Sequence, residues 1–295
     1  MIVVSGSASN HLGFLVAKEL SCKQLTTEVR MFPDGERYIR FAERIDGEDV
    51  VVIQSLYKNP DSLITEYGFM VRTLLEFGAR RILGVFPYLA YLRQDQRFKD
   101  GEVVSSKVVS WMIETFDTSE VFVVDPHLHR LAGLKELFNI PAHNISAMPN
   151  LAHYAKEVLN ATNPIIVAPD EEASQWAYKV ASELNAEFKV AEKKRMGDND
   201  VIIHLGDISP AGKDILLVDD MVSTGGTLAT ISKNLKLLGA RRIIALVTHG
   251  LFAEGSYERL QDAGVDYIVT SDSVPNPYAL VTVAPLIADA IRQEL

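Results

Sequence analysis

Two adjacent carboxylates and a short loop rich in hydroxyl groups and glycine form the stretch of this sequence best suited to bind a substrate. The apolar run 215–218 is expected to form a strand that ends before Asp219. The residues of the stretch that could bind a ligand are Asp219, Asp220, Ser223, Thr224, Gly225, Gly226 and Thr227. Glycines let backbone N–H groups approach an anion closely, hydroxyls add donors, and the N-terminus of the helix that follows adds partial positive charge. The carboxylates repel a phosphate but accept hydrogen bonds from sugar hydroxyls. The stretch therefore predicts a ribose 5-phosphate site, in preference to a strand, a turn and a capped helix without a ligand.

Two further polar segments in the first half could serve a second substrate. Residues 32–36, Phe-Pro-Asp-Gly-Glu, form a turn between strand-like segments, and by themselves they favour a surface hairpin. Arg93, Gln94 and Arg97 follow the strand-like run 82–86. Arginine suits phosphate because its guanidinium group donates two parallel hydrogen bonds. A solvated basic loop is an equally good interpretation of these three residues.

Two candidate ligand-binding residues stand just past apolar strand-like runs. His127 follows the run 121–124, and Asp170 follows the run 165–168. The carboxyl ends of parallel strands are where such sheets bind ligands, which favours a functional role for both residues. Zinc is a poor candidate because the sequence has neither a cysteine cluster nor an H-x-x-x-H pair. A hydrogen-bonded structural histidine and a helix N-cap at Asp170 remain open alternatives.

The charged segment 192–195, Glu-Lys-Lys-Arg, leads into the polar residues 196–200, which show little periodicity. On the residues alone, this pattern is typical of a charged surface loop. The functional alternative is a loop that closes over phosphates and brings Lys193 and Arg195 to developing negative charge.

Strand-like apolar runs alternate with helical patterns along the chain, which predicts an α/β fold of mostly parallel sheets flanked by helices. In the first half we expect strands at 2–4, 50–54, 82–86 and 121–124, and helices at 10–20, 61–77 and 104–115. These elements place most of the candidate residues just after a strand, at one edge of a sheet.

Two sequence repeats predict that the chain contains two copies of one fold. Residues 74–82 recur as 235–243, and both copies contain Gly-Ala-Arg-Arg-Ile, with Gly78 or Gly239 placed to end a helix. Residues 145–152 resemble 281–288. We therefore expect domains at 1–145 and 146–295, with the final helix able to pack on the first domain. The first copy has the residues 54–60 where the second has its carboxylates and glycines.

Composition excludes several classes of protein. A net charge of −10 argues against nucleic acid as a partner, because proteins that bind it need a basic surface. The single Cys22 excludes an internal disulfide and a cysteine zinc cluster, and it fits a reducing cytoplasm. The N-terminus lacks a signal-peptide pattern, and no apolar run reaches the length of a membrane span. We expect a cytoplasmic protein with no membrane partner.

An ordered set of motifs along essentially the whole chain resembles the ribose-phosphate pyrophosphokinases (PRPP synthetases), in a compact form often seen in archaea. The set is Ser5-Gly6-Ser7, 32–36, Pro87-Tyr88, Arg93-Gln94-Asp95, Asp125-x-His127, Pro169-Asp170, Lys193-x-Arg195, 218–221 and Thr248-His249-Gly250. Phosphoribosyltransferases share only the stretch 215–228, so the set is far more specific. The resemblance implies two tandem domains of the type I phosphoribosyltransferase-like fold. It also implies the reaction of ATP with ribose 5-phosphate to give PRPP and AMP.

The resemblance also implies a role for each matching residue. The residues that would contact ATP are Phe32, Asp34, Gly35, Glu36, Arg93 and Gln94. Magnesium would be held by His127 and Asp170. Lys193 and Arg195 would stabilise the transition state, with Arg195 also reaching the sugar phosphate. Asp219 and Asp220 would bind the ribose hydroxyls, and 223–227 the 5-phosphate. In such enzymes the turn 32–36 reaches the ATP site of a neighbouring subunit, which implies a homodimer or a larger homo-oligomer.

The chain departs from the family pattern at two places. Ser223 stands where many members have an acidic residue, and Glu171 and Glu172 stand where many have small residues. The second departure leaves family-style regulation by phosphate and ADP open. Two other functions also stay open. A phosphoribosyltransferase has no use for an ATP turn or a duplicated fold, and a catalytically silent regulatory homologue has no need to keep Lys193 and Arg195.

Overall fold

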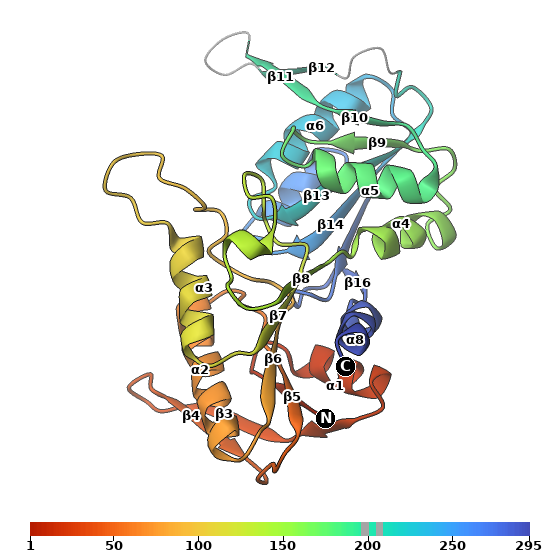
Figure 1. Cartoon of the computed structure of the whole chain (residues 1–295). Coiled ribbons are helices and arrows are strands. Elements are labelled where there is room, and N and C mark those ends of the chain that lie inside the picture. Colours follow the sequence, from red (N-terminus) through yellow and green to blue (C-terminus); the bar gives the residue numbers. More distant parts are fainter. Residues whose placement is uncertain (196–200, 205–208) are drawn as a thin grey trace. The chain divides into compact units, whose positions relative to one another are not determined.

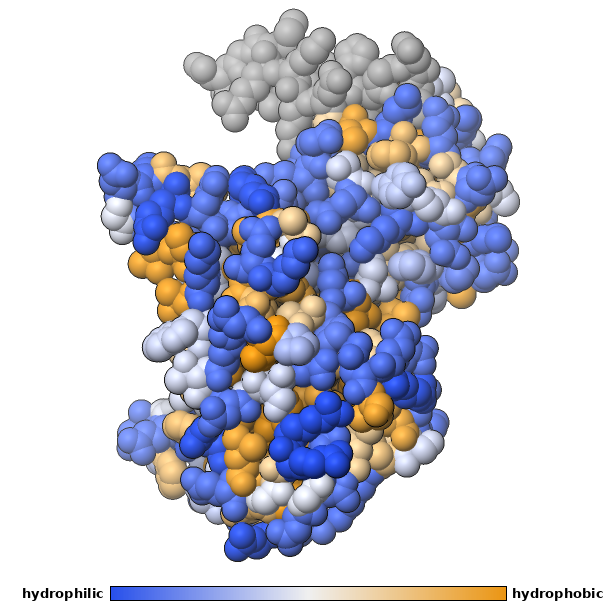
Figure 2. Space-filling model, viewed as in Figure 1, coloured by the Kyte–Doolittle hydropathy of each residue, from blue (hydrophilic) through white to orange (hydrophobic). Residues whose placement is uncertain are grey.

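The computed structural model describes residues 1–195, 201–204 and 209–295, with the backbone alone described at 192–195 and 201–204. The chain divides into two compact units, residues 1–146 with 282–295 and residues 147–281. Each unit contains a parallel sheet flanked by helices, which confirms the predicted α/β class (Figure 1). On the face drawn in Figure 2, hydrophilic residues predominate and apolar ones lie among them. No helix in the described ranges is long and apolar enough to cross a membrane.

The first unit is built on a six-stranded parallel sheet with the order β2-β1-β5-β6-β7-β8. Its strands are β1 (Ile2–Ser5), β2 (Lys23–Leu25), β5 (Asp49–Ile53), β6 (Arg81–Phe86), β7 (Glu120–Val124) and β8 (Ala142–Ile145). One face carries α2 (Pro60–Glu76) and α3 (Ser105–Thr115), and the other carries α1 (Asn10–Glu19) and α8 (Ala284–Gln293) (Figure 1). An antiparallel hairpin of β3 (Thr27–Met31) and β4 (Arg37–Phe41) is inserted between β2 and β5, and a short 3₁₀ helix spans Leu134–Glu136.

The second unit repeats this plan with the strand order β10-β9-β13-β14-β15-β16. Its strands are β9 (Ile165–Ala168), β10 (Phe188–Val190), β13 (Asp214–Val222), β14 (Arg242–Gly250), β15 (Tyr267–Ser271) and β16 (Ala279–Val281). Helix α4 (Met148–Glu157) packs against α5 (Ser174–Leu184), and α6 (Gly226–Leu237) packs against α7 (Ser256–Asp262). A second antiparallel hairpin joins β11 (Glu192–Arg195) to β12 (Val201–His204).

The central strands carry continuous apolar runs, such as 50–53 in β5 and 215–218 in β13, because helices cover both faces of each sheet. Every residue of β5 is buried, and so is the run 214–218 of β13. Helix α8 packs against α1 and β8 of the first unit. His143 of β8 lies 2.6 Å from an oxygen of Glu120. It also lies 3.7 Å from an oxygen of Glu294, the residue that directly follows α8. The last helix is therefore held to the first sheet by polar as well as apolar contacts.

The four strands and three helices predicted with bounds in the first half lie within one residue of those bounds, but two local expectations were wrong. Strand β13 does not end before Asp219. It continues to Val222 because β14 is equally long and pairs with it as far as Gly250. The segment from 192 does not begin as an irregular loop either. Its first four residues pair with 201–204, where the sequence Val-Ile-Ile favours a strand.

Candidate functional site

The ribose-phosphate loop predicted from the sequence connects β13 to α6 in the second unit. Residues 223–225 form the connection, and α6 begins at Gly226. Gly225 has a φ of +70°, and a Cβ there would lie 3.2 Å from the Leu260 side chain, so the turn requires glycine. At Gly226 the nearest atom to such a Cβ is 3.8 Å away. The turn therefore leaves room for an anion beside the first N–H groups of α6, which have no partners inside the helix.

Residues 251–259 support this loop from the protein side. The Ala253 N–H donates to the Ser223 carbonyl at 2.9 Å, and the Arg259 guanidinium donates to the Thr224 carbonyl. Carbonyl oxygens held in this way do not repel a bound phosphate. Sequence reasoning missed Arg259, because a single arginine in a short helix carries no signal of the backbone group it contacts.

Asp219 and Asp220 lie on the last part of β13, directly before the loop. Asp220 is 1% exposed, Asp219 is half-buried, and the Asp220 N–H donates to Asp219 Oδ1 at 3.0 Å. Burial raises the pKa of Asp219, and the negative charges of Asp220 and Asp170 raise it further. Three carboxylates this close suit a cation or sugar hydroxyls, because either would relieve their repulsion.

Asp170 follows β9 and closes a turn ahead of helix α5. Its Oδ1 accepts a hydrogen bond from the Ala173 N–H at 3.2 Å. Helix α5 begins at Ser174 and has Ala173 at its N-cap position. The alternative interpretation of Asp170 as the N-cap of this helix is therefore wrong. The turn places the Asp170 carboxylate near enough to act on the pKa of Asp219.

The turn 32–36 joins the two strands of the β3–β4 hairpin in the first unit, as its residues suggested. The Phe32 N–H donates to the Glu36 carbonyl at 2.8 Å, and Gly35, with a φ of +96°, donates to the Phe32 carbonyl at 2.9 Å. Phe32 is 39% exposed and packs edge-on against Tyr38, with the Arg30 guanidinium over both rings. Asp34 and Glu36 thus stand on a compact, well-braced turn.

The loop after β6 contains Arg93, Gln94 and Arg97, the residues considered for phosphate binding. Gln94 is fixed by Ser105, whose hydroxyl donates to Gln94 Oε1 at 3.0 Å. The Nε atom of Arg97 donates to the Glu102 carbonyl at 2.9 Å, so Arg97 braces its own loop. Arg93 is exposed. Gln94 and Arg97 are therefore held by hydrogen bonds within the segment that leads from β6 into α3.

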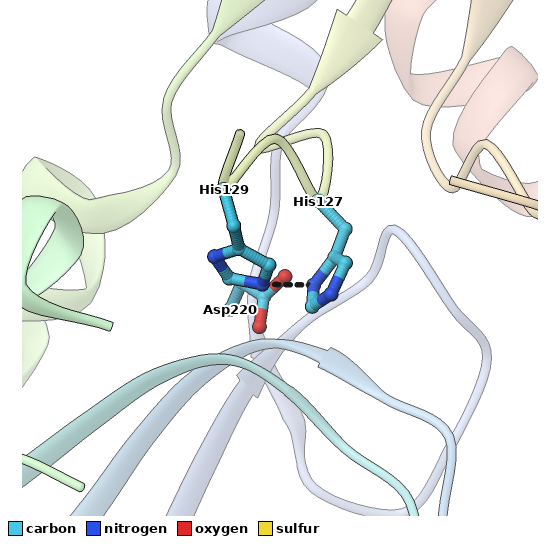
Figure 3. A group of neighbouring side chains, drawn as sticks. All are labelled: His127, His129 and Asp220. Carbon is cyan, nitrogen blue, oxygen red and sulfur yellow. Dashed lines mark hydrogen bonds between the residues drawn. The ribbon is translucent and has the colours of Figure 1, made fainter. Parts of the chain in front are cut away.

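His127 and His129 pair directly after β7. A nitrogen of His129 lies 2.9 Å from Nδ1 of His127, and the rings meet edge to face with centroids 3.7 Å apart (Figure 3). Before them, Asp125 is fully buried and accepts from the Ser146 hydroxyl at 2.7 Å. The extended spacing of the two histidines therefore places both rings on one side of the chain, as i and i+2 positions predict. His127 belongs to the first unit and Asp170 to the second.

The predicted catalytic residues Lys193 and Arg195 lie on β11, where they pair with Ile203 and Val201 in backbone register. Their side chains lie outside the described part of the chain, as do residues 196–200 altogether.

Comparisons with known proteins agree with this architecture. The N-terminal domain of ribose phosphate pyrophosphokinase matches residues 1–116, and the phosphoribosyl transferase domain matches residues 133–285. A ribose-phosphate pyrophosphokinase from Sulfolobus acidocaldarius is 36% identical and covers 99% of this chain and 100% of its own. One from Methanopyrus kandleri is 35% identical and covers 99% of each. The crystal structure of phosphoribosylpyrophosphate synthetase from Mycobacterium smegmatis matches with a TM-score of 0.87 at 26% identity, over 99% of this chain and 98% of that one.

The repeated parallel sheets and the loop after β13 define two tandem phosphoribosyltransferase-like domains. The similarity extends over the full length, and the chain belongs to the ribose-phosphate pyrophosphokinase family, whose members are diphosphate-transferring enzymes. The family, fold and enzyme class inferred from the motifs are thereby confirmed.

Proposed function

We propose that this chain transfers the β,γ-diphosphoryl group of ATP to the anomeric hydroxyl of ribose 5-phosphate, giving PRPP and AMP. The observation that carries the proposal is the geometry at the end of β13. There, a pair of adjacent carboxylates leads into a glycine turn at a helix N-terminus. The full-length relationship to ribose-phosphate pyrophosphokinases supports the same activity.

Ribose 5-phosphate binds in the second domain. Its phosphate accepts hydrogen bonds from backbone N–H and hydroxyl groups of 223–227, at the positive end of the α6 dipole. Asp219 and Asp220 accept hydrogen bonds from the ribose hydroxyls. A sugar held at both ends presents its anomeric oxygen in a fixed direction, which lowers the entropic cost of the attack on the β-phosphorus.

ATP binds through the first domain, to the turn residues Phe32, Asp34, Gly35 and Glu36 and to Arg93 and Gln94. Magnesium is the metal that we expect with it, held by His127 and Asp170. The carboxylates around Asp170 fit a hard cation, because oxygen ligands suit magnesium and their repulsion falls when a cation binds. The metal would offset the charge of the phosphates.

Lys193 and Arg195 supply the positive charge that meets the transferring group, and Arg195 also contacts the sugar phosphate. Transfer of this kind leaves little covalent work for the protein, so preorganised cations and positioning dominate. The in-line displacement forms the bond from the anomeric oxygen to the β-phosphorus and breaks the bond from the β-phosphorus to the bridging α-phosphate oxygen, which leaves with AMP. The proton of the anomeric hydroxyl is released to water.

Residues 1–145 form the domain that binds ATP, and residues 146–295 form the domain that binds the sugar. The last helix packs on the first domain. The active enzyme is at least a homodimer in which the turn 32–36 contributes to ATP binding by a neighbouring subunit. The position of Phe32 supports this idea, because a large aromatic ring left 39% exposed on a turn is suited to stack on a further ring.

The test is an assay with ATP, ribose 5-phosphate and magnesium, in which AMP and PRPP are both quantified. We expect the two products in equal amounts, and neither when any one component is omitted. Consumption of PRPP with a nucleobase would instead indicate a phosphoribosyltransferase. The absence of turnover in a folded preparation would indicate a silent homologue.

A further inference from the structure

The first unit contains a fully buried carboxylate at the place where the second unit binds its anion. Glu66, on α2, is 0% exposed. It accepts hydrogen bonds from the Ser7 N–H at 2.6 Å, the Ser7 hydroxyl at 2.8 Å and Gln54 Nε2 at 3.0 Å. The guanidinium of Arg37 completes the set, with Nη1 2.5 Å from Glu66 Oε2. These are the kinds of donor that would otherwise surround a phosphate.

The position of Glu66 matches the phosphate loop in the repeated fold. Glu66 precedes Gly78 by the same number of residues as Thr227 precedes Gly239. Ser7 and Gln54 follow β1 and β5, the strands equivalent to β9 and β13. A Cβ on Gly6 would lie 2.3 Å from Gln54 Oε1, so the Gly6 backbone packs tightly against the Gln54 side chain that donates to Glu66. The carboxylate of the chain itself thus stands where a ligand phosphate would stand in the second unit.

The partner of this carboxylate is the residue that follows the turn 32–36. Arg37 begins β4, directly after Glu36, and its side chain is 18% exposed. Elsewhere the turn is separated from α2 by a cavity of about 600 Å³, whose lining includes Gly35, Asp61 and Phe69. The ion pair of Arg37 with Glu66 therefore fixes the turn end of the β3–β4 hairpin to helix α2 beside this cavity.

We propose that Glu66 is a positioning residue for ATP: a built-in anion that has replaced a bound phosphate and holds the hairpin through Arg37. This inference rests on the proposed role of the turn 32–36 in ATP binding. A carboxylate fixed in this way orients Asp34 and Glu36 without touching the nucleotide. A displacement of Asp34 or Glu36 by about 1 Å can reduce catalytic activity up to a hundredfold.

The closing experiment compares Glu66→Gln with Asp49→Asn, a matched buried carboxylate that pairs with Arg80 and Arg81 at the opposite end of the sheet. We expect Glu66→Gln to raise the KM for ATP by about tenfold or more, with the KM for ribose 5-phosphate unchanged. Asp49→Asn should lower the Tm and leave both KM values alone. If Asp49→Asn does not fold, Glu120→Gln is the second control. Equal changes in both KM values, or none, would overturn the proposal.

A readout that does not need turnover separates this proposal from the proposed function. Amide hydrogen exchange over 27–41 should become faster in Glu66→Gln and in Arg37→Gln, and the double variant should be no faster than either. Acetate or formate should slow the exchange again in Glu66→Ala, because either anion fits the vacated cradle. Parental exchange in the single variants would show that Glu66 does not hold the hairpin, whatever the activity of the enzyme.

Discussion

The amino ends of the two sheets are alike in detail. In the first unit Asp49 opens β5 and pairs with Arg80 and Arg81, and in the second Asp214 opens β13 and pairs with Arg241 and Arg242. The backbone agrees as well. The Gly47 N–H donates to the Gly78 carbonyl at 2.8 Å, and the Gly212 N–H donates to the Gly239 carbonyl at 2.8 Å. This edge of each sheet carries the scaffold that both copies need.

The carboxyl ends of the same sheets differ in almost every polar residue. After β5 come Gln54 and Ser55, where β13 has Asp219 and Asp220. Helix α2 starts at Pro60, is 17 residues long and brings Glu66 inward, whereas α6 starts at Gly226 and is 12 residues long. The comparison teaches that the copies have kept one edge for stability and have diverged at the edge where parallel sheets bind ligands.

The inserted hairpins follow the same rule. In the sequence, each hairpin follows an edge strand and precedes a central strand of its sheet. Hairpin β3–β4 follows β2 in the first unit, and β11–β12 follows β10 in the second. One carries the turn 32–36, and the other carries Lys193 and Arg195. A duplicated structural device thus serves, in our proposal, ATP binding in one copy and transition-state stabilisation in the other.

The largest expected effect concerns the second hairpin. Lys193→Ala and Arg195→Ala should each lower kcat by about a hundredfold or more, because a preorganised cation is lost at the transition state. Melting temperatures should stay near that of the parent. Lys194→Ala is the matched control, since it removes an equal charge at the intervening position of the same segment. Near-normal kcat in both variants would remove the hairpin from the mechanism.

Breaking the scaffold edge should cost stability without changing substrate preference. In Asp214, burial acts to raise the pKa, but hydrogen bonds from Arg242 and Arg241 outweigh it and lower the pKa overall. Asp214→Asn should cost up to about 3 kcal/mol of unfolding free energy in urea titrations at neutral pH. Because the folded pKa is depressed, the contribution of the carboxylate is present above its ordinary pKa of about 4 and is lost as pH falls below it. A variant as stable as the parent at neutral pH would contradict this account.

Breaking the ligand edge should change sugar binding. Asp220→Asn and Gly226→Val should weaken ribose 5-phosphate by about 2 kcal/mol, while ATP binding changes little. The first variant loses a charged acceptor, and the second fills the space that a phosphate needs beside α6. Separate calorimetric titrations of the two substrates check this, with Gly133→Ala as the glycine control, because a Cβ there meets no atom within 4 Å. Equal losses for both ligands would point to misfolding.

The same edge should gain stability when one of its charges is removed. The pKa of Asp219 is raised by burial and by Asp220 and Asp170, so its charged form is unfavourable in the ligand-free fold. That raised pKa means that its contribution to stability is fully present at low pH and is lost as pH rises through the folded pKa. Asp219→Asn should therefore raise the unfolding free energy at neutral pH by up to about 1 kcal/mol, at the expense of activity. A lower unfolding free energy would show that the carboxylates are satisfied without a ligand.

The smallest expected signal tests sharing between subunits. At subsaturating ATP and ribose 5-phosphate, Glu36→Ala and Asp220→Asn should each retain only a small part of the parental activity, and their mixture, after dissociation and reassociation, should regain about a quarter of it. Hybrid dimers then contain one composite site without either lesion. Mixing that restores nothing would mean that each chain holds a complete site.

Much of this organisation could be predicted from the sequence, because it depends on local patterns. Apolar runs and glycine stops placed the first-half elements to within one residue, and the repeated Gly-Ala-Arg-Arg-Ile exposed the duplication. The loop 223–227 could be predicted as a phosphate site, because glycine and hydroxyl residues ahead of a helix N-terminus suit an anion.

The rest depends on contacts that no local pattern reports. Strand β13 runs to Val222 because of its partner β14, and Arg259 supports the loop from a separate helix. Glu66 looks like any glutamate of an amphipathic helix, and its burial is decided by Ser7 and Gln54 from distant strand ends. Tertiary pairing decides such positions, so a single sequence leaves them open.

The most direct measurement of the central claim follows the label from ATP that carries ³²P at the β position. Incubated with the enzyme, ribose 5-phosphate and magnesium, this substrate should yield unlabelled AMP and PRPP that contains all of the transferred label. The same result is expected with label at the γ position, because both phosphates move together. Label that stays in ADP, with only the γ-phosphate transferred to the sugar, would contradict the account.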